Sequence, residues 1–154
     1  MLRRMDIEKV LVPVSGNGVD SEVIRLACEI AEKNSASVYV VYVIEVDRSK
    51  SLDAADEART MAAEEILVRA EDMARADGYL ISTALIQARE AGPAIVDEAR
   101  DGNVDLIVMG VGYRRRLASK PGEFDIGETT SHVLREAPCH VVLYRTPLAT
   151  EDAE

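Results

Sequence analysis

The sequence predicts an α/β protein built on an open, five-stranded parallel sheet with helices on both faces. Five apolar runs of strand length occur along the chain, and a segment with helical spacing follows each of the first four. The apolar residues in these runs do not alternate with polar ones, as expected for strands that are covered on both sides. Strands that alternate with helical crossovers form a parallel sheet.

The ends of each element follow from local residue chemistry. The predicted strands cover residues 9–14, 37–43, 79–87, 104–109 and 139–144. Helices are predicted over about residues 20–33, 54–77, 92–102 and 127–137. Asp20 or Ser21 can cap the first helix, Asn34 and Gly78 suit helix ends, and Pro93 suits a first helical position. The second helix is expected to pack through an apolar stripe of Ala58, Ala62, Ile66, Ala70 and Met73.

Size and charge limit the kinds of partner. The 154 residues predict one domain, with a folded core over about 7–146 and an acidic tail over 147–154. The net charge of −10 argues against nucleic acid and anionic membranes as partners. Without a membrane-length apolar run or a signal peptide, a cytoplasmic location is expected. Cys28 and Cys139 are expected to be buried, reduced thiols.

The stretch from Val104 to Tyr144 has the residue order of an anion-binding site. Its strand runs into Gly110 and Gly112, and Gly127 later opens a helix whose N-terminal N–H groups and dipole favour an anion. Between them lies a basic loop with Arg114, Arg115, Arg116 and Lys120. Arginine can donate two hydrogen bonds to one phosphate. The same residues could instead be turn glycines and an ordinary solvated loop.

In this stretch the chain resembles the single-domain universal stress proteins. That family carries the signature Gly-x2-Gly-x9-Gly-Ser/Thr, which binds ATP. Gly110 matches its first glycine and Gly127 its last, and GETTSHVLREAPCHVVLY follows in the family manner. The resemblance covers nearly the whole chain. It implies the strand order 3-2-1-4-5, and ATP or another adenine nucleotide, alone or with Mg²⁺, at the point where that order reverses.

The resemblance also implies a set of nucleotide-binding residues. They are Pro13, Val14, Ser15, Val41, Val43, Met109, Gly110, Gly112, Arg114, Arg115, Gly127, Glu128, Thr129 and Thr130. The chain departs from the family pattern at Ser15, where Asp is usual, at Tyr113, where the second glycine belongs, and at Glu128, which replaces Ser or Thr. A carboxylate in the first helical turn is itself stabilised, typically by ~0.3–1 kcal/mol. Glu128 therefore partly replaces the anion, unless a divalent metal or the arginines bridge the carboxylate and the phosphate, and weak ATP binding is expected.

Two other classes of function stay open. One is a nucleotide-free interaction module, in which Tyr113 and Glu128 fill the crevice. The other is an enzyme, because SGNGVDS at residues 15–21 resembles the SGGxDS loop of N-type ATP pyrophosphatases with Asn17 inserted. The chain is short for that family, and no nucleophile and base can be paired from the spacing. No catalytic residue or metal ligand is therefore assigned, and at most weak ATP hydrolysis is expected.

The last strand is expected at an edge of the sheet. An uncovered apolar edge tends to pair with another strand, and in the resembling family this edge pairs with its copy across a two-fold axis. The resemblance therefore implies a homodimer through Val141, Val142, Leu143 and Tyr144.

Overall fold

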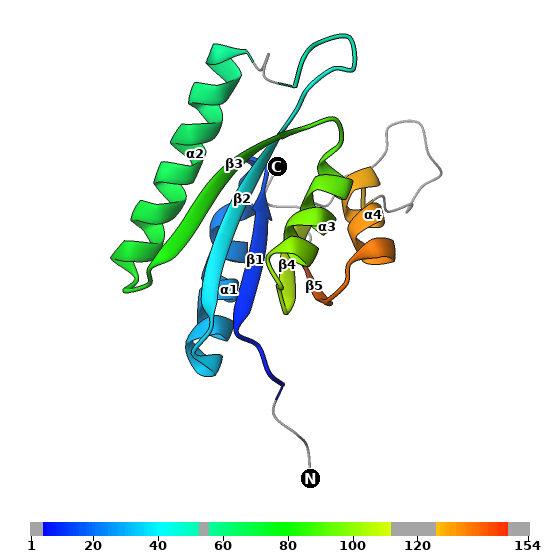
Figure 1. Ribbon diagram of the computed structural model, residues 1–154. Coiled ribbons are helices and arrows are strands. Elements are labelled where there is room, and N and C mark those ends of the chain that lie inside the picture. Colours follow the sequence, from blue (N-terminus) through cyan, green and yellow to red (C-terminus); the bar gives the residue numbers. More distant parts are fainter. Residues whose placement is uncertain (1–4, 53–55, 112–125, 148–154) are drawn as a thin grey trace.

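The computed structural model describes residues 5–52, 56–111 and 126–147 (Figure 1). The strands are β1 (Lys9–Val14), β2 (Ser37–Glu45), β3 (Ile81–Ala88), β4 (Leu106–Val111) and β5 (His140–Arg145). The helices are α1 (Asp20–Asn34), α2 (Glu57–Ala76), α3 (Ala91–Asp101) and α4 (Glu128–Glu136). Strands and helices alternate along the chain as the sequence predicts.

All strand pairs are parallel, and the sheet has the order β3-β2-β1-β4-β5. This confirms the predicted fold class and order. The order reverses between β1 and β4, because the chain builds outward from β1 to β3 and then returns to the other side of β1. Both β3 and β5 are edge strands, so each has one side that no described strand of the chain covers.

Two helix layers enclose the sheet. Helices α1 and α2 pack on one face, whereas α3 and α4 lie together on the other, as Figure 1 shows. Alternate residues of a strand point to opposite faces. Accordingly, Val12 and Val108 pack with the α1 side, and Leu11 and Ile107 pack with the α3 side. All four are fully buried, which explains the unbroken apolar runs in the sequence.

The two cysteines belong to different apolar clusters. Cys28 is buried in α1, whereas Cys139 is half-buried beside the α3–α4 cluster, and the two thiols are free. Burial, with the charge of Asp77 adding to it, raises the pKa of the Cys28 thiol to about 11. The sheet thus separates two weakly acidic thiols.

The face that α2 presents to the sheet differs from the prediction. Ala58 and Ala62 are exposed, and the buried residues are Ala63, Leu67, Ala70 and Ala74. Of the predicted stripe, Ala70 is buried, and Ile66 and Met73 are half-buried. Alanine occurs on several sides of this helix, so the periodicity allowed two stripes, and packing against β2 and β3 selects one of them.

Several element ends also differ. Helix α2 begins at Glu57 because the Asp56 side chain accepts a hydrogen bond from the Ala58 amide at 2.8 Å. Strand β4 starts at Leu106 and continues through Gly110 to Val111, so Gly110 does not end it. Val19, rather than Asp20 or Ser21, is the cap residue of α1. Helix α3 starts at Ala91, which places Pro93 in its first turn but not at its first position.

Candidate functional site

Strands β1 and β4 separate at the C-terminal edge of the sheet. They pair at Val10–Leu106 and Leu11–Ile107, although β1 continues to Val14 and β4 to Val111. On their outer sides, β1 stays paired with β2, and β4 with β5, to the ends of the strands. The sheet therefore opens where its order reverses, which is where open parallel sheets bind ligands.

The structure divides the predicted site residues between the two faces of the sheet. Val41, Val43 and Met109 belong to the α3–α4 side, and Pro13 has the same strand parity as Leu11 on that side. Val14 belongs to the α1 side. Met109 and Val41 are buried, whereas Val43 and Pro13 are half-buried and lie nearer to the opening. An apolar patch thus faces α3 and α4 next to the gap between β1 and β4.

Gly110 has a packing role that the sequence did not indicate. A Cβ atom on Gly110 would lie 2.6 Å from Val23 Cγ2 and 2.7 Å from Val19 Cγ1. Both valines are buried in or beside the start of α1. Glycine at this position lets α1 approach β4, so its presence does not by itself indicate a phosphate.

Gly127 is the cap residue of α4, and the described residues leave open space where a side chain on it would lie. Its backbone has φ 83° and ψ 163°, a combination that is essentially restricted to glycine. A Cβ atom there would meet no described atom within 4 Å. The first helical hydrogen bond runs from the Ser131 amide to the Gly127 carbonyl at 3.1 Å. Because α4 runs antiparallel to the strands, its N-terminal amides lie at the C-terminal edge of the sheet.

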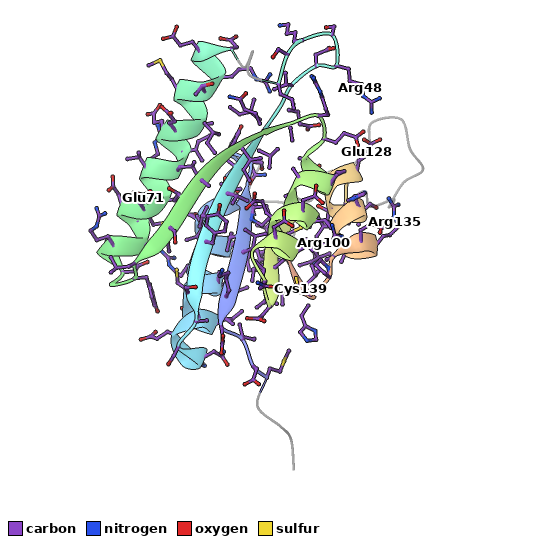
Figure 2. All side chains as sticks on the ribbon, in the orientation of Figure 1. Arg48, Glu71, Arg100, Glu128, Arg135 and Cys139 are labelled. Atoms are coloured by element: carbon purple, nitrogen blue, oxygen red, sulfur yellow. The ribbon has the colours of Figure 1, made fainter. Side chains whose placement is uncertain are left out.

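A cavity of about 400 Å³ lies between the start of α3 and the length of α4, and is called the α3–α4 cavity below. Its lining consists of Glu45, Glu90, Ala91, Gly92, Pro93, Gly127, Glu128, Thr129, Ser131, His132 and Arg135. Gly92 allows the helices to approach closely, since a Cβ atom on it would lie 2.8 Å from His132 Cβ. Figure 2 shows Glu128 and Arg135 near opposite ends of α4.

Of the predicted site residues, Gly127, Glu128 and Thr129 line this cavity, and Thr130 is buried behind them. Sequence reasoning did not assign Glu45, Glu90, His132 or Arg135 to the site. Glu45 and Glu90 could have been found from their positions. Glu45 ends β2 and Glu90 precedes α3, so both lie at the C-terminal edge of the sheet, where parallel sheets bind their ligands.

The turn after β1 is closed by Asp20. This carboxylate accepts hydrogen bonds from the Gly16 amide at 2.7 Å and from the Ser15 amide at 3.4 Å. Burial raises the pKa of Asp20 against the opposing effect of those amides. Two of the amides that a pyrophosphate loop would offer to an anion, those of Ser15 and Gly16, are thus already used. This arrangement disfavours the pyrophosphatase interpretation of SGNGVDS.

Several predicted site residues lie outside the described residues. They are Gly112, Arg114 and Arg115, with the neighbouring Tyr113, Arg116 and Lys120. Within the described parts of the chain, no group of three or more His, Cys, Asp or Glu side chains could hold a metal ion. None of the described helices has the length and apolar composition needed to cross a membrane.

The chain matches the Universal stress protein family over residues 6–145. It therefore belongs to this family, as its sequence and fold predict. Comparison with curated proteins gave no match.

Solved structures of this family have the same fold. A universal stress protein from Archaeoglobus fulgidus is 25% identical, with a TM-score of 0.70 over 88% of this chain and 97% of that chain. The structure of the universal stress protein from Archaeoglobus fulgidus in complex with dAMP is 22% identical, with a TM-score of 0.71 over 90% and 98% of the chains. A universal stress protein in complex with cAMP is 21% identical, with a TM-score of 0.66 over 91% and 98%.

Proposed function

We propose that this protein binds an adenine nucleotide weakly and acts as a nucleotide-responsive regulatory protein of the cytoplasm, with at most weak ATPase activity. The adenine would lie against Pro13, Val43 and Met109, and the phosphates, alone or with Mg²⁺, would point toward the first turn of α4. Family members crystallised with dAMP and cAMP support adenine as the recognised base.

One observation carries the proposal: the separation of β1 from β4 beside an open, glycine-started helix. The pairing of β1 with β4 ends at Leu11–Ile107, and the space next to Gly127 is clear of described atoms. The half-buried apolar residues Pro13 and Val43, near the ends of β1 and β2, suit contact with a flat base. The N-terminal amides and the dipole of a helix suit a phosphate.

Weak binding is expected because Glu128 occupies the first position of α4. Its carboxylate uses the same positive end of the helix dipole that a phosphate would use. We expect calorimetry with Mg-ATP to give a dissociation constant weaker than about 1 μM. A tighter constant would contradict the role given to Glu128.

Replacing Gly127 tests the location of the site. The variant Gly127→Val places a branched side chain beside the α4 amides, and we expect it to abolish nucleotide binding. Gly18→Val is the matched control, because a Cβ on Gly18 also meets nothing within 4 Å and Gly18 lacks a positive φ. Equal nucleotide affinity in both variants, measured by calorimetry, would place the ligand elsewhere.

A nucleotide-free interaction module is the second candidate. Three carboxylates line the α3–α4 cavity, which makes the site less favourable for a polyphosphate. The protein has no Trp and five Tyr, so it absorbs weakly at 280 nm and a co-purified adenine would dominate at 260 nm. Purified protein with a protein-like absorbance ratio, and no calorimetric response to any adenine nucleotide or adenosine, would favour the interaction module.

The proposed assembly is a homodimer through β5. One side of β5 is paired with β4 along its full length, and the strand ends the sheet on its other side. Leu143 is 37% exposed there, and Val141 and Val142 are half-buried. Pairing with a second copy would satisfy the backbone groups of this edge and cover Leu143.

A further inference from the structure

We infer that the α3–α4 cavity sets the charge of the ligand, so that the protein prefers adenosine or an adenosine monophosphate to ATP. This inference rests on the proposed nucleotide site and states its ligand class. It differs from the argument on Glu128 alone, because it depends on carboxylates from three separate elements that converge next to the first turn of α4.

The three carboxylates lie together because of the topology. Glu45 is the last residue of β2, Glu90 is the cap residue of α3, and Glu128 is the first residue of α4. The strands are parallel and the helices run back across the sheet, so all three positions fall at its C-terminal edge. Each residue is exposed and lines the same cavity of about 400 Å³.

Two of the described cations near this cavity, Arg135 and Arg89, are poorly placed to neutralise that charge. Arg135 lines the cavity, but it is seven residues beyond Glu128, which corresponds to about 10 Å along a helix. Figure 2 shows the two side chains at different levels of α4. Arg89 is adjacent to Glu90 in sequence, yet its Nη1 donates to the carbonyls of Asp47 at 2.6 Å and Lys50 at 2.7 Å.

The position of the carboxylates determines which part of a nucleotide they affect. With the base against the strand ends and the first phosphate at Gly127, any further phosphates would extend toward Glu45, Glu90 and Glu128. Like charges a few ångströms apart in water weaken binding by about three- to fivefold per pair of unit charges. Adenosine carries no phosphate charge, and a monophosphate carries less negative charge than ATP. The loss of affinity caused by repulsion from the carboxylates therefore grows with each added phosphate.

The test is calorimetry with adenosine, AMP, ADP and ATP, in buffer without Mg²⁺, on the wild type and on the triple variant Glu45→Gln, Glu90→Gln, Glu128→Gln. Glu64→Gln is the control, because Glu64 is exposed on α2 at the other face. In the wild type we expect ATP to bind at least about tenfold more weakly than AMP. In the triple variant, the affinity for ATP should rise about tenfold relative to the wild type. The affinity for adenosine should stay within about twofold of the wild-type value. Added salt should reduce the difference between the AMP and ATP affinities of the wild type, because salt screens the repulsion between charges.

The outcomes separate the two proposals. Wild type that binds ATP as tightly as AMP, or a triple variant with the wild-type ratio of ATP to AMP affinity, would overturn the charge inference while leaving the nucleotide site in place. Binding of none of the four ligands by either protein would overturn the proposed function, and this inference with it.

Discussion

At the residue scale, two glycines at the C-terminal edge of the sheet are required for different physical reasons. Gly127 has a backbone conformation that side chains disfavour, but no described atom lies within 4 Å of an added Cβ. Gly110 lacks a positive φ, but it has no room for a side chain. Alanine at either site therefore tests conformation in one case and packing in the other.

Gly127→Ala should destabilise the protein by about 1–3 kcal/mol, because the start of α4 would be held in a strained conformation. The free energy of unfolding in urea, without ligand, measures this cost. Gly18→Ala is the control, since Gly18 has neither a positive φ nor a neighbour within 4 Å of an added Cβ. A Gly127→Ala protein as stable as Gly18→Ala would show that α4 starts without strain.

Gly110→Ala should cost about 1–3 kcal/mol by overpacking, because its Cβ would lie 2.6 Å from Val23 Cγ2. Adding Val23→Ala should recover part of this loss, so the double variant should be more stable than the sum of the single effects predicts. Urea unfolding of the four proteins in the cycle measures the coupling. Additive effects would mean that Val23 does not limit the space at Gly110.

At the element scale, the turns at the C-terminal edge contain two aspartates whose pKa values shift in opposite directions. Burial raises the pKa of Asp20, which accepts from the Gly16 amide. Hydrogen bonds from the backbone and side chain of Ser49 lower the pKa of Asp47, which accepts from the Ser49 amide at 2.9 Å. The β1–α1 turn and the β2–α2 turn should therefore respond differently to pH.

Asp20 contributes stability that is present at acid pH and lost as pH rises. Its folded pKa exceeds the ordinary value of 3.8, so the folded state binds the proton more tightly than the unfolded state does. Relative to Asp20→Asn, wild type should lose stability as pH rises from below the ordinary pKa of 3.8 to above it. Relative to Asp47→Asn, the wild-type protein should gain stability as pH rises. Urea unfolding across this range measures both slopes, and slopes of the same sign would contradict the assignment.

The sequence predicted the alternation of elements because strands buried on both faces leave unbroken apolar runs. It could not place the apolar stripe of α2, since this helix has alanine at Ala58 and Ala62 as well as at Ala63 and Ala70, and neighbouring strands decide which side is covered. The packing of Gly110 against Val23 likewise depends on residues far apart in the chain. The convergence of Glu45 and Glu90 required the sheet order first.

At the scale of the whole molecule, the two edges of the sheet differ in how they are covered. At the β3 edge, α2 packs against the strand, and the Thr83 hydroxyl donates to the Glu71 carboxylate at 2.5 Å. At the β5 edge, the Tyr144 hydroxyl donates to Glu22 at 3.2 Å, while Leu143 stays partly exposed. Self-association is therefore expected at β5 rather than at β3.

Leu143→Lys should convert the proposed dimer to a monomer, because the two-fold axis would bring two lysine ammonium groups together in the interface. Leu80→Lys is the matched control: Leu80 is 85% exposed and precedes β3 at the opposite edge, so this variant should keep the dimer mass. Light scattering at micromolar concentration measures the mass of each protein. A monomer mass for the wild-type protein would contradict the proposed dimer through β5. A dimer that dissociates with Leu80→Lys but persists with Leu143→Lys would move the interface to the β3 edge, and the proposed nucleotide site would be unaffected because neither leucine lines it.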